Sequence, residues 1–199
     1  MKLYYAPGAC SLADHIALIE SGLPYETEHV DLRSRITAGG ADFRLINPKG
    51  YVPALEMDDG EILTENIAIL SYIAAESGWL SPPDGPIHWR VLEMTAYIST
   101  EIHKHFKLLF DPSADPEQQA KTRKLLTQTF NRLAGDMGDT TCLFGEHPMI
   151  ADCYLFVMLM WARGKAGVHL PARLNTYFDH LCKRPSVRQA LEDEGLDMS

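Results

Sequence analysis

Residues 3–11 read Leu3-Tyr4-Tyr5-Ala6-Pro7-Gly8-Ala9-Cys10-Ser11, and this stretch decides the fold. An apolar and aromatic run that is followed by Pro and Gly is typical of a strand that leaves a sheet through a turn. The apolar residues after it recur at spacings of four, three and four, as on one face of an amphipathic helix: Leu12, Ile16, Ile19 and Leu23. We therefore expect a strand, a tight turn and a helix that begins close to Cys10.

Cys10 directly precedes the apolar pattern of the predicted helix. At a helix start, the unpaired N–H groups and the positive end of the helix dipole favour a thiolate over a thiol. The position therefore predicts a lowered pKa and a nucleophilic sulfur near neutral pH. A small apolar side chain that fills the first turn is the other interpretation, and position alone leaves both open.

The composition indicates a globular protein with reduced thiols. The 199 residues are 46% hydrophobic, which is enough to bury a sizeable core in one or two domains. The cysteines are widely separated and predict neither a disulfide framework nor a zinc site: Cys10, Cys142, Cys153 and Cys182. A net charge of −9 without a basic cluster argues against nucleic acid or an anionic membrane as partner. Because no long apolar segment is present, we expect a cytoplasmic protein.

The first 78 residues alternate between strand and helix patterns. Gly22-Leu23-Pro24 marks the end of the first helix, and residues 25–30 read as a second strand. The patterns that follow predict a loop, one helical turn, a two-stranded hairpin and a helix, over residues 31–40, 42–46, 54–63 and 64–74. The order β-α-β and then β-β-α is the plan of a thioredoxin-like α/β domain, a plan that leaves the chemistry open.

Residues 79–86 separate this domain, residues 1–78, from a helical one. They include Ser81-Pro82-Pro83-Asp84-Gly85-Pro86, which neither a helix nor a strand accommodates, so we predict a linker. Breaks at Gly and Pro then divide the helical patterns into residues 88–110, 116–136, 150–164, 170–183 and 186–194. The predicted fold is α/β + all-α, a thioredoxin-like domain followed by an all-helical C-terminal domain over residues 87–199.

Five motifs carry a family resemblance. They are Met-Lys-Leu-Tyr-Tyr-Ala-Pro-Gly-Ala-Cys-Ser-Leu, Asn-Pro-Lys-Gly-Tyr-Val-Pro-Ala-Leu, Leu-Thr-Glu-Asn, Glu-Ile-His-Lys and Ala-Asp-Cys-Tyr-Leu-Phe, starting at residues 1, 47, 63, 101 and 151. In this order they resemble the cytosolic glutathione S-transferases over nearly the whole chain. The opening looks like the bacterial beta class, in which Cys occupies the place that other classes give to Tyr or Ser. The resemblance implies a homodimeric glutathione transferase that uses glutathione as co-substrate, acts on small hydrophobic electrophiles and needs no metal.

The resemblance also implies a glutathione site in the first domain. Cys10 takes the thiol-binding position and holds glutathione by a hydrogen bond or as a mixed disulfide. Pro53 is expected to be cis, although sequence alone favours trans, and the main chain of Val52 then meets the cysteinyl part of glutathione. The remaining contacts that the resemblance implies are made by Ser11, Tyr51 and Arg35, the last of which stands where relatives often carry Lys.

Glu65 and Asn66 lie where a strand gives way to a helix. N–H groups at that helix start can bind a carboxylate, and the Glu65 side chain can accept from an ammonium group, which suits a γ-glutamyl end. An ordinary acidic residue in a first turn is the alternative. The resemblance favours the binding role for both residues.

His103 and Lys104 lie on a polar face of the helix predicted over residues 88–110. The resemblance implies that His103 donates to the sulfur or assists proton movement, and that Lys104 offsets the negative charge of glutathione. A solvated polar face is the simpler interpretation without it. His105 is two residues from His103 and points in another direction, which argues against a metal pair.

Two departures from the beta-class pattern limit what is carried over. Ala96 stands where the pattern has Asn, so one polar contact with the ligand is missing. Met149 stands three residues before Asp152, where relatives have a helix-capping Ser or Thr. A Met at that position predicts a helix start that is less stable by roughly 1 kcal/mol.

Two other functions stay open. The stretch Cys10-Ser11-Leu12-Ala13 lacks the second cysteine of a C-x-x-C pair, which excludes a dithiol mechanism. A monothiol glutathione-dependent thiol-disulfide reductase is still compatible with it. A non-catalytic scaffold or regulatory protein of the same fold is the third hypothesis, and the intact set of predicted site residues argues against it.

Overall fold

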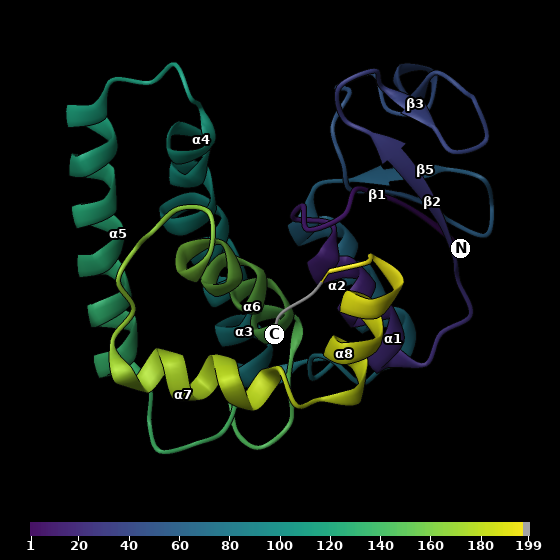
Figure 1. The fold of residues 1–199 in the computed structure, drawn as a ribbon. Coiled ribbons are helices and arrows are strands. Elements are labelled where there is room, and N and C mark those ends of the chain that lie inside the picture. Colours follow the sequence, from purple (N-terminus) through teal and green to yellow (C-terminus); the bar gives the residue numbers. More distant parts are fainter. Residues whose placement is uncertain (197–199) are drawn as a thin grey trace. The chain divides into compact units, whose positions relative to one another are not determined.

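The structure is a computed structural model that describes residues 1–196. The chain divides into two compact units (Figure 1). The first unit is Met1–Pro83 together with the C-terminal stretch that begins at Arg184, and the second is Asp84–Lys183. A mixed sheet with helices in the first unit and helices alone in the second confirm the predicted fold class.

A five-stranded sheet forms the centre of the first unit. Its strands, in the order β3-β2-β1-β4-β5, are Ile36–Thr37, Glu26–Asp31, Lys2–Tyr5, Ala54–Glu56 and Ile62–Thr64. β1 runs parallel to β2 and pairs Leu3 with Thr27, whereas β4 lies antiparallel on the other side of β1 and pairs Leu55 with Leu3. The predicted β-α-β and β-β-α order is therefore confirmed.

The strand β3 corrects the prediction of a loop over residues 31–40. After β2, the Asp31 carboxylate accepts hydrogen bonds from the N–H groups of Arg33 and Ser34, and Arg35 has a positive φ of 64°. This turn brings Thr37 back to pair with Val30. A strand of two residues is too short to show the alternation by which strands are recognised in a sequence.

The helices α1 (Leu12–Ser21) and α2 (Asn66–Ser77) belong to the same unit. Leu12 and Ile16 are buried, as the spacing predicts, and α1 ends at Gly22 in the left-handed conformation that glycine adopts most easily. A second apolar cluster contains Tyr4, Val30 and Phe43, the last from the short helix η1 (Phe43–Leu45) that fulfils the predicted helical turn. Buried side chains of the helices and of this apolar cluster thus fix β1 and the turn that follows it.

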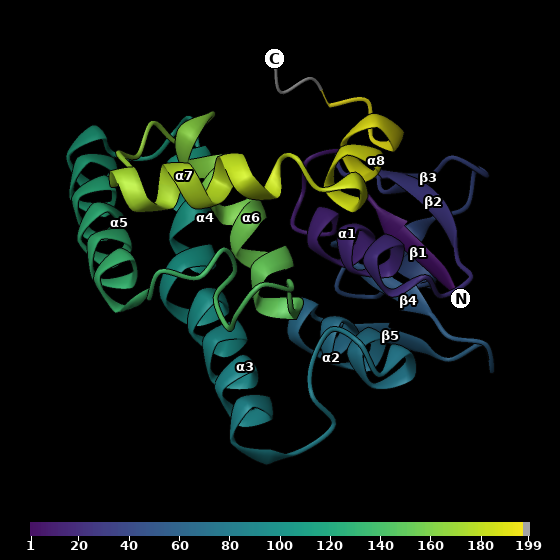
Figure 2. The ribbon, with the colours of Figure 1, turned by 90° about the horizontal axis from the view of Figure 1, so that it is seen from below.

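The last helix, α8 (Pro185–Asp193), packs on α1 in the first unit (Figure 2). The prediction groups residues 87–199 by their order in the chain, whereas the contacts group α8 with the sheet unit. Arg184 Nη2 donates to Glu20 Oε1 at 2.5 Å, and Glu194 Oε1 lies 3.0 Å from His15 Nδ1. Periodicity identifies an amphipathic helix, but the partner that covers its apolar face is set by packing.

The second unit consists of helices only. They are α3 (Gly85–Tyr97), a π-helical segment η2 (Ile98–His103), α4 (Lys104–Phe110), α5 (Pro116–Asp136), α6 (Ile150–Arg163) and α7 (Ala172–Leu181). Gly85 and Pro86, predicted to lie in the linker, open α3. Every side chain of residues 150–159 is buried, so α6 is the central helix of this unit. Within residues 1–196 no helix is both long and apolar enough to cross a membrane.

Candidate thiol site

The turn that carries Cys10 is held by main-chain and side-chain hydrogen bonds. Ala9 N donates to Ala6 O at 3.0 Å, and Ala6 N donates to Ser11 Oγ at 3.2 Å. Ser11 is the N-cap residue of α1 and is fully buried, so its hydroxyl supports the turn from inside. Cys10 is half-buried, and its Sγ lies 3.5 Å from the main-chain oxygen of Val52.

Val52 and Pro53 are joined by a cis peptide bond, as the resemblance implies. The segment before them is fixed by Asn47, whose Nδ2 donates to Tyr51 O at 2.7 Å and whose Oδ1 accepts from Lys49 N at 3.1 Å. Asn47 is 1% exposed, so these bonds are shielded from water. The strand entrance that faces Cys10 is therefore held in one conformation.

Glu65 is the N-cap residue of α2 and has a positive φ of 75°. Its Oε1 accepts hydrogen bonds from Lys49 Nζ at 2.5 Å and from the Tyr51 hydroxyl at 2.9 Å. The bond from Lys49 lowers the pKa of the Glu65 carboxyl, so this carboxylate is ionised at neutral pH. An exposed carboxylate at a helix start can accept hydrogen bonds from an ammonium group.

Asn66 lies behind Cys10, and its side chain faces inward. Its Nδ2 donates to the main-chain oxygen of Cys10 at 2.9 Å and to Asp14 Oδ2 at 3.3 Å. Because Asn66 is only 7% exposed, the predicted ligand contact of this residue depends on its main-chain N–H at the start of α2.

Arg35 is half-buried and lies beside the turn of residues 47–50. A Cβ atom placed on Gly50 would lie 4.0 Å from Arg35 Nε. The first unit therefore brings together the loops that carry the predicted residues Arg35 and Tyr51. Their contacts with a ligand stay predictions.

Burial, and not the helix start, dominates the ionisation of Cys10. Desolvation raises the pKa of its thiol to about 12, and the nearby Asp14 carboxyl adds to the rise. Hydrogen bonds from the N–H groups of Cys10 and Ser11 lower the pKa, but by less. Of the two interpretations that the position of Cys10 leaves open, the raised pKa favours the protonated thiol over the thiolate that the helix start alone predicts.

His103 is the last residue of the π-helical segment in the second unit. Its Nδ1 lies 2.5 Å from the Tyr154 hydroxyl, and its ring packs edge-on against Trp161 with centroids 5.2 Å apart. Burial lowers the pKa of His103 to about 4, so the imidazole is neutral at neutral pH. Lys104 is exposed, and its Nζ lies 3.4 Å from Glu101 Oε1. The roles of His103 and Lys104 toward glutathione stay predictions.

Two residues near these groups, Asp14 and Lys49, were missed by the sequence reasoning, as was the contact of the buried Tyr154 with His103. Asp14 carried no signal of burial, because it lies two positions from both Leu12 and Ile16, off the apolar face of the predicted helix, where a charged residue is expected to be exposed. The contacts of Lys49 and Tyr154 carried no signal either, because the partner residues lie 16 and 51 residues away in the chain.

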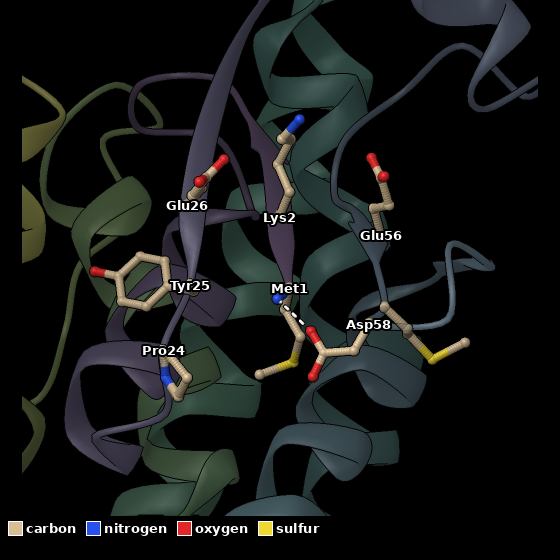
Figure 3. A pocket seen from close by; sticks show the side chains of 8 residues that line it. Met1, Lys2, Pro24, Tyr25, Glu26, Glu56 and Asp58 are labelled. Atoms are coloured by element: carbon tan, nitrogen blue, oxygen red, sulfur yellow. Dashed lines mark hydrogen bonds and ion pairs between the residues drawn. The ribbon is translucent and has the colours of Figure 1, made fainter.

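A cavity of about 590 Å³ lies where the central strands β1 and β2 begin and β4 ends (Figure 3). It is lined at the starts of β1 and β2 by Lys2 and Glu26, and by Asp58, which accepts a hydrogen bond from the Met1 ammonium group at 2.6 Å. Cys10 follows the opposite end of β1, so this cavity is separate from the thiol site. Among residues 1–196, no cluster of three or more His, Cys, Asp or Glu side chains could hold a metal ion.

Comparison with known proteins extends over the full length of the chain. The family model of the glutathione S-transferase N-terminal domain matches residues 9–76. Glutathione S-transferase GstA of Escherichia coli O157:H7 is 38% identical over 200 residues, which cover 98% of this chain and 100% of the relative.

Two solved structures are similar in fold as well as in sequence. A sphingomonad glutathione S-transferase complexed with glutathione has a TM-score of 0.90 and 40% identity, covering 99% of this chain and 100% of that chain. A bacterial beta class glutathione S-transferase of Sphingomonas chungbukensis gives the same values. Because this similarity spans both chains from end to end, as the order of the five motifs predicts, the chain belongs to the glutathione S-transferase family.

Proposed function

We propose that this protein conjugates glutathione to small hydrophobic electrophiles, with Cys10 at the position that receives the glutathione thiol. One observation carries the proposal: the Cys10 sulfur, the main chain of Val52 and the start of α2 are joined by direct contacts. Cys10 Sγ lies 3.5 Å from Val52 O, and Asn66 Nδ2 lies 2.9 Å from Cys10 O. A thiol, a strand-like main chain and a helix start are the groups that a cysteinyl-glutamyl peptide requires side by side.

The chemistry of each group matches one part of glutathione, which is bound in the solved sphingomonad relative. The Val52 main chain offers hydrogen bonds to the cysteinyl residue. The ionised Glu65 carboxylate accepts from the α-ammonium group, and the N–H of Asn66 at the start of α2 donates to the α-carboxylate. Arg35 supplies positive charge for the remaining carboxylate.

At the reacting end, the Cys10 thiol acts as a hydrogen-bond donor. A protonated sulfur cannot attack an electrophile, but its S–H can stabilise the thiolate of bound glutathione, which then attacks the electrophile. As the family resemblance implies, the proposal gives the neutral His103 the role of a hydrogen-bond donor and Lys104 that of offsetting the negative charge of glutathione. A mixed disulfide between Cys10 and glutathione would need a thiolate at Cys10, so we rank it below the hydrogen bond as the way in which Cys10 holds glutathione.

The proposal includes a homodimer in the cytoplasm, as in the cytosolic glutathione transferases that the sequence resembles. Leu45 and Trp89 are 86% and 65% exposed, which supports a contact with a second copy. Light scattering on the purified protein tests the dimer: a mass near twice 22.3 kDa supports it, and a mass near 22.3 kDa contradicts it.

Glu65→Ala tests the transferase function, with a chloro-nitroaromatic compound as electrophile. The variant loses the acceptor for the ammonium group, so we expect kcat/KM for glutathione to fall at least about tenfold with the fold intact by circular dichroism. Glu76→Ala, an exposed acidic residue at the other end of α2, is the matched control and should keep full activity. Full activity in Glu65→Ala would overturn the proposal.

Thiol-disulfide exchange is the second candidate, because the residue at this position is a thiol that reaches Val52 O. Turnover of a glutathionylated peptide beside the chloro-nitroaromatic compound separates the two functions. Cys10→Ser keeps a hydrogen-bond donor but no exchangeable sulfur, so it should retain conjugation and lose exchange.

A further inference from the structure

Asp14 is a buried carboxyl group that the proposed function leaves without a role. It lies in the first turn of α1, four residues after Cys10, and is 0% exposed. Its Oδ2 accepts the hydrogen bond from Asn66 Nδ2 at 3.3 Å. Its Oδ1 has no hydrogen-bond partner in the part of the chain that the structure describes. A buried carboxyl group with only one of its two oxygens hydrogen-bonded is uncommon in folded proteins.

The amide of Asn66 connects this carboxyl to the thiol turn. The same Nδ2 atom donates to Cys10 O at 2.9 Å, so one buried amide holds α1 and the Cys10 turn against the first residue of α2. The start of α2 is also where Glu65 is placed. The distance between the thiol and the helix start therefore depends on a hydrogen bond that Asp14 helps to orient.

The electrostatic surroundings of Asp14 are acidic. Burial raises the pKa of Asp14 well above its usual value, and Glu194, which follows α8, raises it further. Asp14 is in turn the largest contribution after burial to the raised pKa of Cys10, and Glu65 adds a smaller one. Further titratable groups on the elements packed around α1 include Tyr5 on β1, His15 on α1 itself, Tyr72 and Glu76 on α2, and Asp193 at the end of α8.

We propose that Asp14 is a positioning residue of the thiol site: through Asn66 it holds the Cys10 turn against α2, and its carboxyl opposes a negative charge on the Cys10 sulfur. A negative charge on the buried Asp14 carboxyl then disfavours a second one on the sulfur of Cys10, four residues before it in the chain. The inference rests on the proposed function for the role of Cys10 in the reaction. It explains why a cysteine beside a helix start is kept as a hydrogen-bond donor.

Asp14→Asn separates charge from hydrogen bonding, because the Asn side chain can still accept from Asn66 but cannot ionise. The readout is the rate at which iodoacetamide alkylates Cys10, followed by peptide mass spectrometry as a function of pH. We expect this profile to move to lower pH by about one unit, which is read as a rate roughly tenfold faster at a fixed, mildly alkaline pH on its rising limb. Asp14→Ser, a smaller side chain without charge, should move it in the same direction and replaces Asp14→Asn if that variant does not fold.

The matched control is Glu20→Gln, which removes a carboxylate from the other end of α1 and should leave the profile in place. Asp14→Leu lacks an acceptor for Asn66, so we expect it to raise KM for glutathione severalfold, whereas Asp14→Asn should leave KM within about twofold. An unchanged alkylation rate in folded Asp14→Asn, or an unchanged KM in folded Asp14→Leu, would overturn the proposal.

Alkylation of Cys10 does not require turnover of glutathione. A shifted profile in a protein without conjugating activity would therefore uphold the role of Asp14 and reject the proposed function. An unshifted profile in a protein with conjugating activity would uphold the proposed function and reject the role of Asp14.

Discussion

The ionisation of Cys10 is set by what surrounds the sulfur rather than by the helix that follows it. The effect of the helix dipole is strongest in the first turn. Cys10 precedes the N-cap residue Ser11 and therefore lies just outside that turn. Loss of water and the neighbouring Asp14 outweigh the N–H groups that favour a charge. A sequence shows the helix start, but the buried carboxyl beside it depends on how α1 packs on α2.

His103 also has an ionisation that burial controls, and this predicts a pH dependence of stability. Its pKa falls from 6.5 to about 4 in the folded protein, so between these values the unfolded chain binds a proton that the folded chain does not. Stability therefore decreases as the pH falls from about 6.5 to about 4, by up to about 1.4 kcal/mol per pH unit for this group. His103→Asn removes the titrating group, so its melting temperature should fall less steeply in that window.

The measurement is thermal unfolding of both proteins at several pH values, with the slopes compared rather than the absolute stabilities. The variant loses packing against Trp161 and is expected to be less stable throughout. Equal slopes for the two proteins would contradict the burial-driven shift.

At the scale of elements, the start of α6 shows the effect of one side chain on a helix. Asp152 Oδ2 accepts from the N–H of Met149 at 2.8 Å, which is one half of a capping box. The other half calls for a good acceptor at position 149, and a thioether is a weak one. Met149→Thr should therefore raise the free energy of unfolding by about 1 kcal/mol and the melting temperature by about 2–4 °C.

Met137→Thr is a suitable control, because Met137 is also half-buried but lies at the C-terminal end of α5, where a hydroxyl has no helix start to cap. It should give no gain in calorimetry. An unchanged or lower melting temperature for Met149→Thr would show that the hydroxyl does not complete the box.

Elements with a long periodic pattern were predicted well from the sequence, whereas two short or irregular ones were not. Residues 116–136 are predicted as a helix and form α5 with the same ends. The strand β3 and the π-helical segment η2 escaped prediction because each depends on a few main-chain hydrogen bonds that no side-chain spacing records. π-Helical turns occur often at functional sites, which agrees with the predicted role of His103 at the end of η2.

At the scale of the whole molecule, chain order predicted the two kinds of unit but not the membership of α8. Its buried face, which includes Val187 and Ala190, is readable from the sequence. Its position on α1 is not, because any apolar helix face could cover it. The thiol site was likewise predicted only in part. Its motif residues were predicted from the resemblance, whereas the burial of Asp14 and the inward direction of the Asn66 side chain follow only from packing.

Protection of Cys10 by glutathione tests the central claim, a glutathione site at this thiol, most directly. The rate of Cys10 alkylation by iodoacetamide is measured by peptide mass spectrometry with and without saturating glutathione, and half-buried Cys182 serves as the internal reference. We expect glutathione to slow alkylation of Cys10 at least about tenfold, to leave Cys182 unchanged, and to lose its effect in Glu65→Ala. Alkylation of Cys10 at the same rate with and without glutathione would contradict the account.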